Sequence, residues 1–264
     1  MARIDGKTVW ITGASSGIGE ELAYQLASKN CNLILSARRK EVLEMVKDKC
    51  SNKENIYVLP LDVTKFEGME AKVGEILSKV GKVDILVNNA GISQRSLIAD
   101  TEFSVYKKMI DVDYLGTVAL TKALLPHFIK HKSGHFVTVS SLMGKFSSPY
   151  RSGYCAAKHA LHGFFDSLRM EHDKDNIMVT MICPGFVNTN IAKSALTADG
   201  TAQGNNDTAT QNGISSKTLC LKMIQAIEKG NYEAYIGGKE TKGILVKRFF
   251  PRLLHKLVLK SEVR

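Results

Sequence analysis

The sequence predicts an α/β protein built on a doubly wound parallel sheet of about seven strands with helices on both faces. Two observations predict this fold: short apolar runs alternate with amphipathic helical patterns, and a glycine-rich turn at residues 12–19 follows the first run. A chain of 264 residues is long enough to bury the core of one such domain. Strands that alternate with helices indicate right-handed βαβ units, in which successive strands lie parallel.

The expected elements follow one another in regular order. Strands are expected at residues 7–12, 32–36, 56–63, 83–88, 135–141, 176–185 and 233–237. The first helix places Ile18, Leu22 and Leu26 on one face, and further helices are expected at residues 41–49, 67–80, 105–115, 118–130, 154–171 and 217–229. We expect a single cofactor-binding and catalytic domain over residues 1–238, followed by a basic amphipathic extension over residues 239–264.

Composition limits the class of protein. Hydrophobic residues make up 44% of the chain and charged residues 23%, as in globular proteins. The five cysteines are scattered without a CxxC pair, which indicates reduced thiols and a reducing compartment. Only a handful of residues precede the first apolar run, and no signal or spanning segment is visible, so we expect a cytoplasmic protein.

The glycine stretch TGASSGIG, Thr12 to Gly19, lies between the first strand and the first helix. Glycines at such a junction allow a tight turn and close approach of the backbone, so the helix N-terminus can hold a pyrophosphate. The position of the turn favours this interpretation over a structural turn.

The second strand ends in SARRK, where an NAD enzyme would place an acidic residue for the ribose hydroxyls. Arg38 and Arg39 instead supply positive charge, which suits a 2′-phosphate. The alternative is a solvated charge run that opens a helix. We favour the cofactor interpretation, with Arg38 ahead of Arg39, and therefore expect NADP(H).

Tyr154 and Lys158 are four residues apart in YCAAK, at the start of an expected helix, and Ser141 lies thirteen residues before Tyr154. Helical spacing places the phenol and the ammonium on one face. The ammonium would favour the tyrosinate and lower the tyrosine pKa. A serine, a tyrosine and a lysine can together polarise and protonate a carbonyl oxygen, whereas YxxxK alone would indicate only a surface helix.

Taken together, these motifs resemble the short-chain dehydrogenase/reductase family. TGASSGIG, NNAG at residues 88–91, Ser141, YCAAK and PGFVNT at residues 184–189 follow the order and spacing of that family over about residues 5–237. DYLGTVALTKALLPHF and the run around YCAAK are similar to the branch that contains 11-beta-hydroxysteroid dehydrogenases and related dehydrogenase/reductase proteins.

The resemblance implies a Rossmann-type fold and a role for each matching position. Tyr154 would be the catalytic acid/base, Lys158 would bind the nicotinamide ribose and lower the tyrosine pKa, and Ser141 would hydrogen-bond the substrate oxygen. The implied cofactor-binding residues are Gly13, Ser15, Ser16, Gly17, Ile18 and Gly19 in the glycine loop, with Arg38, Arg39, Asp62, Val63, Asn88, Ala90, Gly91, Pro184, Gly185, Val187 and Thr189. The family also implies a homodimer or homotetramer.

One position departs from the family pattern. The run DVDYLG places Asp113 where the family usually has a catalytic asparagine, whose main chain helps to hold a water that relays protons to the lysine. A backbone role survives this change, so we expect activity. The carboxylate could also pair with Lys158 and offset its effect on Tyr154. Both interpretations stay open at the level of the sequence.

The polar segment at about residues 190–216 follows PGFVNT, where the resemblance implies a substrate lid. Its length and composition indicate a mobile lid or a disordered insertion. Its contacts choose the substrate, so the sequence specifies only a small carbonyl or alcohol, with a lipophilic or steroid-like one implied by the branch.

The extension is the anomaly in the charge distribution. The whole chain has a formal net charge of +10, and residues 239–264 carry eight Lys/Arg against two Glu, or 8 − 2 = +6. Apolar residues from Val246 to Leu257 recur near helical spacing, and Pro251 would kink the helix or begin a new one. The segment would contact a membrane peripherally, or pack over the substrate pocket or a partner subunit.

Three other hypotheses about function are less favoured. A metal site formed by His127, His131 and His135 is interrupted by Gly134 and the following strand. Nucleic-acid binding through the basic extension lacks an aromatic platform. A cofactor-binding regulatory protein with little turnover is the alternative to the enzyme, and only Asp113 supports it.

Overall fold

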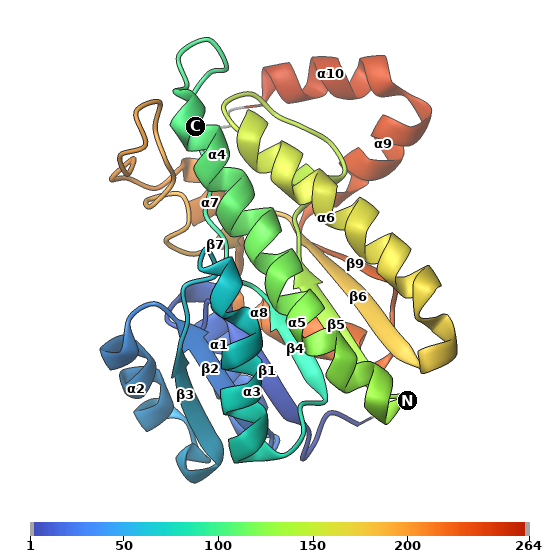
Figure 1. Ribbon diagram of the computed structural model, residues 1–264. Coiled ribbons are helices and arrows are strands. Elements are labelled where there is room, and N and C mark those ends of the chain that lie inside the picture. Colours follow the sequence, from blue (N-terminus) through green and yellow to red (C-terminus); the bar gives the residue numbers. More distant parts are fainter. Residues whose placement is uncertain (1–2, 262–264) are drawn as a thin grey trace.

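The computed structural model describes residues 3–261. Its main sheet has seven parallel strands in the order β3-β2-β1-β4-β5-β6-β9, as the alternation of the sequence predicts (Figure 1). Trp10 in the centre of β1 pairs with Ile34 on one side and Leu86 on the other. The strands are β1 (Thr8–Thr12), β2 (Asn32–Ala37), β3 (Ile56–Pro60), β4 (Ile85–Asn88), β5 (Gly134–Val139), β6 (Ile177–Pro184) and β9 (Glu233–Ile236).

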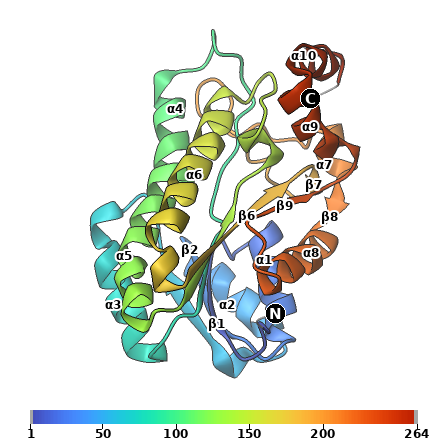
Figure 2. The same cartoon turned by 90° about the vertical axis from the view of Figure 1, so that its right-hand side faces the viewer.

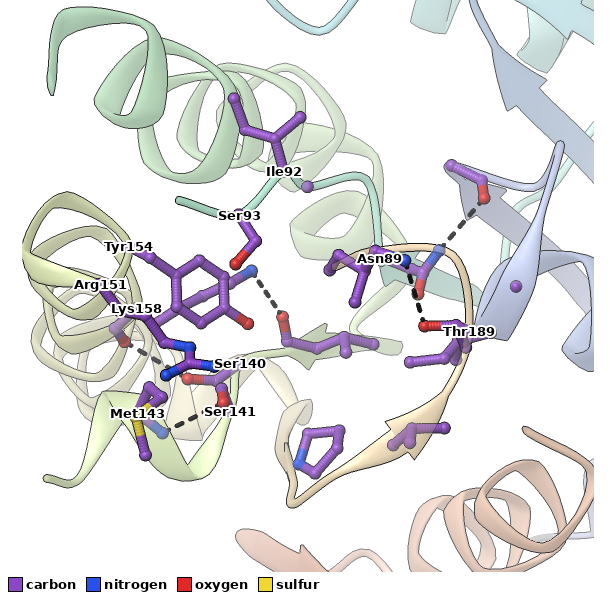
Figure 3. Close-up of a pocket in the computed structure, with 18 of the residues that line it drawn as sticks. Asn89, Ile92, Ser93, Ser140, Ser141, Met143, Arg151, Tyr154, Lys158 and Thr189 are labelled. Carbon is purple, nitrogen blue, oxygen red and sulfur yellow. Dashed lines mark hydrogen bonds between the residues drawn. The ribbon is translucent and has the colours of Figure 1, made fainter. Parts of the chain in front are cut away.

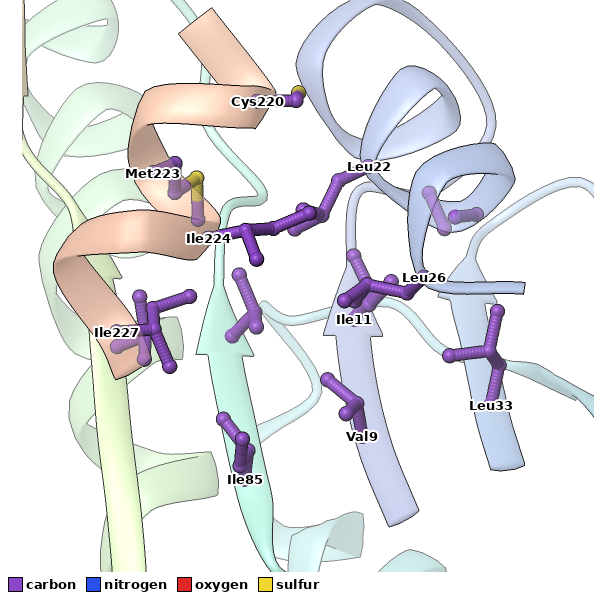
Figure 4. Packing of buried hydrophobic residues seen from close by; sticks show 14 of the residues in the cluster. Val9, Ile11, Leu22, Leu26, Leu33, Ile85, Cys220, Met223, Ile224 and Ile227 are labelled. Carbon is purple, nitrogen blue, oxygen red and sulfur yellow. The ribbon is translucent and has the colours of Figure 1, made fainter. Parts of the chain in front are cut away.

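Helices cover both faces of the sheet (Figure 2). On one face lie α1 (Gly17–Ala27), α2 (Lys40–Lys49) and α8 (Ser216–Glu228), and on the other α3 (Met69–Val80), α5 (Gly116–His131) and α6 (Ser152–Glu171). Each layer buries its own apolar cluster. In the first layer Leu22 and Ile224 meet above the strands (Figure 4), and in the second Phe128 packs on Phe136. Burial of these side chains is the main stabilising contribution to the fold.

The predicted helices 105–115 and 118–130 form one continuous helical run. It consists of α4 (Phe103–Ile110), one π-helical turn (η3, Asp111–Leu115) and α5. The predicted break is wrong because Gly116 continues the helix and packs tightly, so that a Cβ there would lie 2.7 Å from the carbonyl oxygen of Val63. A π turn places one extra residue in the helix, and such turns are frequent at functional sites.

The segment after β6 is folded rather than a bare polar loop. It contains β7 (Val187–Asn188) and β8 (Ile214–Ser215), which pair with each other, and the short helix α7 (Thr208–Gln211). Ala192, Ala195 and Leu196 are buried in it. These contacts argue against a disordered insertion.

The C-terminal extension forms two helices at the carboxyl end of the sheet, α9 (Gly243–Phe249) and α10 (Pro251–Lys260) (Figures 1 and 2). Pro251 begins the second helix, as one of the two sequence alternatives predicts. Leu254 is buried against the same cluster as Phe146. Within residues 3–261, no helix is both long and apolar enough to cross a membrane.

Candidate active site

A cavity of about 1120 Å³ runs along the carboxyl ends of the strands. The chain turns outward from β1 to β2 and β3 and then returns to β4 on the other side of β1, so the loops after β1 and β4 part at this point. Such a switch point is where doubly wound sheets bind nucleotides. Of the residues that the sequence predicts for the site, the cavity is lined by Gly13, Ser15, Ser16, Gly17, Ile18, Arg38, Arg39, Asp62, Val63, Ala90, Gly91, Ser141, Tyr154, Lys158, Pro184, Gly185, Val187 and Thr189.

Three predicted residues do not line the cavity. Gly19 packs beneath the loop, because a Cβ there would lie 2.4 Å from the carbonyl oxygen of Gly13. The Asn88 amide points to α5 and donates to Thr121 Oγ1 at 3.1 Å. Asp113 is fully buried behind Gly91. These residues therefore support the cavity wall from behind.

The glycine loop is held by the loop after β4. Gly13 and Gly17 adopt φ values of +65° and +59°, which glycine reaches without strain. Thr12 Oγ1 accepts hydrogen bonds from the backbone N–H groups of Asn89 and Ala90, each at 3.0 Å. The Asn89 amide in turn donates to the Thr12 carbonyl oxygen at 3.0 Å. Sequence reasoning missed Asn89, although it lies inside NNAG.

The end of the cavity beside the loops after β2 and β3 carries opposite charges. Arg38 and Arg39 follow β2 and are exposed, and Asp62 follows β3. Burial alone would raise the pKa of Asp62, but hydrogen bonds from Thr64 N–H and Oγ1, at 3.0 and 2.8 Å, and the nearby charge of Arg38 lower it. The charge of Arg38 thus acts on the Asp62 carboxylate, whereas Arg39 is the N-cap residue of α2.

Ser141, Tyr154 and Lys158 come together at the other end of the cavity (Figure 3). Ser141 follows β5, and its Oγ accepts a hydrogen bond from Met143 N–H at 3.1 Å. One helical turn separates Tyr154 from Lys158, whose Nζ lies 5.6 Å from the phenol ring centroid. Lys158 Nζ also donates to the Val139 carbonyl oxygen at 3.1 Å. The expected clustering of the three side chains is therefore present.

The pKa of Tyr154 is raised, whereas the YxxxK pattern predicts a lowered one. Burial is the main cause, because it disfavours the tyrosinate. Lys158 and Ser141 act in the predicted downward direction, but the charge of Asp113 acts upward. The sequence does not show how deeply the phenol is buried.

An ion-pair network near Tyr154 joins Arg95 and Arg151 to Asp207. Arg95, in the loop after β4, donates from Nε and Nη2 to Asp207 Oδ2 at 2.9 and 2.6 Å. Arg151 Nη2 donates to the same oxygen at 3.2 Å. Asp207 belongs to the predicted lid, so this network fixes the lid against two walls of the cavity. No local pattern in the sequence indicates that these residues meet.

Glu240 connects the C-terminal extension to the loop after β6. Its Oε1 accepts hydrogen bonds from the backbone N–H groups of Phe186, at 3.2 Å, and Gly238, at 2.9 Å. A Cβ at Gly185 would lie 2.1 Å from this oxygen and one at Gly237 would lie 2.6 Å from it, so only glycines leave room for the carboxylate. The paired glycines at 237 and 238 are the only sequence signal of this cradle.

The sequence is similar to proteins of a known family. The family model described as short chain dehydrogenase matches residues 7–200. The chain is 49% identical over 223 residues to dehydrogenase/reductase SDR family member 7 of Homo sapiens, covering 82% of this chain and 66% of the human protein. It is 38% identical over 268 residues to dehydrogenase/reductase SDR family protein 7-like of Drosophila melanogaster, covering 99% of this chain and 82% of the insect protein.

Solved structures match the fold. A short chain dehydrogenase/reductase from Burkholderia phymatum in complex with NAD superposes with a TM-score of 0.84 at 21% identity, covering 96% of each chain. ElxO with NADP bound superposes with a TM-score of 0.75 at 26% identity, covering 91% of this chain and 99% of ElxO.

Proposed function

The chain belongs to the short-chain dehydrogenase/reductase family, and we propose that it is an NADP(H)-dependent oxidoreductase that interconverts a ketone or aldehyde and the corresponding alcohol. The observation that carries the proposal is the convergence of Ser141, Tyr154 and Lys158 at the end of the cavity that the glycine loop opens. The loop has positive φ values at Gly13 and Gly17, and no side chain caps the N-terminus of α1. The backbone N–H groups there are therefore open to a pyrophosphate and fit the cofactor.

Each side chain has a role in this proposal. The cofactor, when bound, supplies or accepts the hydride. Tyr154 donates a proton to the carbonyl oxygen in reduction and accepts it in oxidation. Ser141 donates a hydrogen bond to the same oxygen and fixes its position, while Lys158 holds positive charge below the phenol. Pro184, Gly185, Val187 and Thr189 would hold the nicotinamide on the opposite wall.

NADP(H) is proposed over NAD(H) because SARRK offers two cations where a ribose-binding acid would stand. Arg38 is the better candidate for the 2′-phosphate, since it lines the cavity directly after β2, whereas the backbone of Arg39 is already the N-cap of α2. Of the two structural neighbours described above, one holds NADP and the other NAD, so the choice rests on the arginines.

A lipophilic substrate fits the far end of the cavity. Its wall there is apolar and comes from three segments that are distant in the sequence: Met143 and Phe146, Leu196 of the lid, and Val246, Leu254, Leu257 and Val258 of the extension. Apolar walls with a few polar groups at one end are typical of sites for lipophilic small molecules. A steroid-like carbonyl is one member of this class.

The extension also offers a surface for a membrane. Its outer side exposes Phe249, Phe250 and Leu253 by 68%, 63% and 49%. The same two helices carry exposed cations at Lys247, Arg248, Arg252, Lys256 and Lys260. We propose shallow insertion into an anionic bilayer, with the inner side packed over the cavity as the second sequence alternative expects. Co-sedimentation with phosphatidylserine vesicles tests this: binding should be lost in a Phe249→Ser, Phe250→Ser double variant, and equal binding by both proteins would contradict it.

Assembly into a homodimer or homotetramer is proposed through α4–α5 and α6. Each of the two regions leaves a large apolar side chain exposed that an interface would cover, Phe103 by 83% in α4 and Met170 by 73% in α6. Light scattering after size exclusion measures the assembly directly.

The proposed activity is tested by NADPH oxidation against a panel of aliphatic, aromatic and steroidal carbonyls. Turnover of at least one lipophilic carbonyl, with NADPH preferred over NADH, is the expected result. NADPH binding without consumption by any carbonyl would favour the regulatory alternative, for which the buried carboxylate of Asp113 beside Lys158 is the supporting observation.

A further inference from the structure

Asp113 places a buried carboxylate directly behind the proposed catalytic residues. It lies in the π turn between α4 and α5, and its side chain is 0% exposed. Oδ1 accepts a hydrogen bond from Ile92 N–H at 2.7 Å. Oδ2 is also buried, and within residues 3–261 no donor lies within hydrogen-bonding distance of it. A buried carboxylate oxygen without a donor is costly unless a positive charge lies nearby.

The nearby positive charge is that of Lys158. Its Nζ lies 3.7 Å from Asp113 Oδ2 and is only 6% exposed, so solvent screens the pair weakly. The same ammonium lies beneath the Tyr154 ring. An ammonium alone stabilises a neighbouring tyrosinate, whereas one already paired with a carboxylate does so much less. The three groups therefore form one coupled set in which Asp113 competes with the tyrosinate for Lys158.

We propose that Asp113 is a positioning residue that shares the charge of Lys158, so that Tyr154 stays protonated at neutral pH and the site is set for carbonyl reduction. This inference rests on the proposed oxidoreductase function, in which reduction needs the phenol and oxidation needs the tyrosinate. The corresponding alcohol oxidation is then supported mainly at alkaline pH.

The pKa shifts agree with this arrangement. Burial raises the pKa of Asp113 to about 6, against the lowering effects of Lys158 and Ile92 N–H, so the carboxylate is largely ionised at neutral pH. The pKa of Tyr154 is raised by burial and by Asp113, and lowered by Lys158 and Ser141.

The other neighbours of Tyr154 do not provide a second acid. Cys155 raises the pKa of the phenol slightly, and the charge of Arg151 lies within reach of it. From α4 and the lid, the side chains packed on Tyr154 are the apolar Val105, Met109 and Leu196. Among the described residues, Asp113 is thus the acidic side chain that faces Tyr154 and Lys158.

The test is a tyrosinate titration of the folded protein by ultraviolet difference spectroscopy, which needs no turnover. The wild-type curve minus the Tyr154→Phe curve isolates Tyr154, and Asp113→Asn minus Asp113→Asn/Tyr154→Phe isolates it without the carboxylate. Asparagine keeps an oxygen for Ile92 N–H, so the variant removes charge with little change in shape. We expect Tyr154 to ionise well above neutral pH in the wild type, and at a pH lower by about one unit in Asp113→Asn.

The pH dependence of turnover gives a second readout. Below the tyrosine pKa the tyrosinate fraction rises tenfold for each unit by which that pKa falls, so alcohol oxidation near neutral pH should rise about tenfold in Asp113→Asn. The alkaline limb of carbonyl reduction should move to lower pH by the same amount.

The outcomes separate this inference from the proposed function. Identical Tyr154 titrations with and without the carboxylate overturn the inference. So does a wild-type Tyr154 that ionises at or below pH 7, and this measurement decides the matter if Asp113→Asn does not fold. A shifted titration in a protein that turns over no carbonyl supports the charge sharing while the proposed function fails.

Discussion

Arg95 and Asp207 lie 112 residues apart in the sequence and form a buried ion pair, with Arg95 Nη2 at 2.6 Å from Asp207 Oδ2. Their side chains are 4% and 2% exposed. Burial alone would raise the pKa of Asp207, but the hydrogen bonds and charges of Arg95 and Arg151 lower it. The pair anchors the segment at residues 190–216 to the loop after β4.

Removing the charge of Asp207 should loosen this segment. Asp207→Asn leaves two buried guanidinium groups without their shared carboxylate, which should lower the free energy of unfolding by about 3 kcal/mol. Urea denaturation measures the loss, and limited proteolysis should cut within residues 190–216 more rapidly. Asp199→Asn is the matched control, since Asp199 lies in the same segment, is itself exposed, and accepts hydrogen bonds from its near neighbours Thr197 and Thr201. Equal destabilisation by both substitutions would contradict the anchoring role.

Glu240 should influence cofactor affinity although it belongs to the extension. Its carboxylate holds the backbone at Phe186, within the loop proposed to hold the nicotinamide. Glu240→Ala removes a charged acceptor worth roughly 1.5–3 kcal/mol, so the Kd for NADPH should rise by about tenfold or more in a fluorescence titration. Glu240→Gln keeps an acceptor oxygen and should recover most of the affinity. An alanine variant with wild-type affinity would show that the loop holds its shape alone.

Arg38 should decide the choice between the two nicotinamide cofactors. Arg38→Ala loses a charge-assisted contact to the 2′-phosphate, and the Kd for NADPH should rise by about ten- to a hundredfold while that for NADH changes little. Arg39→Ala is the control at the neighbouring position and should have the smaller effect. If Arg38→Ala weakened NADPH and NADH binding equally, Arg38 would support the loop and not bind the 2′-phosphate.

The contacts of Glu233 predict acid sensitivity of the folded state. Burial alone would raise the pKa of Glu233, but the adjacent His162 ring and hydrogen bonds from Lys145 and Tyr235 lower it to about 2. A lowered folded-state pKa contributes stability that is present above the ordinary glutamate value and is lost as the pH falls towards the folded value. The contribution is up to about 3 kcal/mol.

This contribution is measured by urea denaturation between pH 6 and pH 2. Glu233→Gln should be less stable than the wild type at pH 6, and the difference should shrink as the pH falls through about 4. A difference that is constant over this range would assign the loss to packing rather than to charge.

The sheet and the glycine loop could be predicted from the sequence because both depend on local patterns. Apolar runs place β1 and β4, and Gly13 and Gly17 mark a turn that only a positive φ allows. The Tyr154–Lys158 spacing likewise becomes a shared helix face as soon as α6 forms.

The remainder of the site depends on contacts between distant residues, which no local pattern shows. In the sequence Asp207 is one polar residue of a polar loop, and only the fold brings Arg95 against it. Glu240 likewise has the sequence context of a solvated acid, and only the fold places it where Gly185 leaves room for its carboxylate. No residue pattern marks the π turn at Asp113, so the sequence indicated two helices where one continuous run forms. The raised pKa of Tyr154 follows from burial, which depends on the lid and on α4 together.

The central claim is that Tyr154 supplies the proton in a cofactor-dependent carbonyl reduction. Steady-state turnover of a carbonyl by Tyr154→Phe, with NADPH affinity measured on the same sample, tests it most directly. The variant should bind NADPH with a Kd within about threefold of the wild type while kcat falls by at least about a hundredfold, because the ring remains and only the proton donor is lost. Wild-type turnover by Tyr154→Phe would contradict the claim.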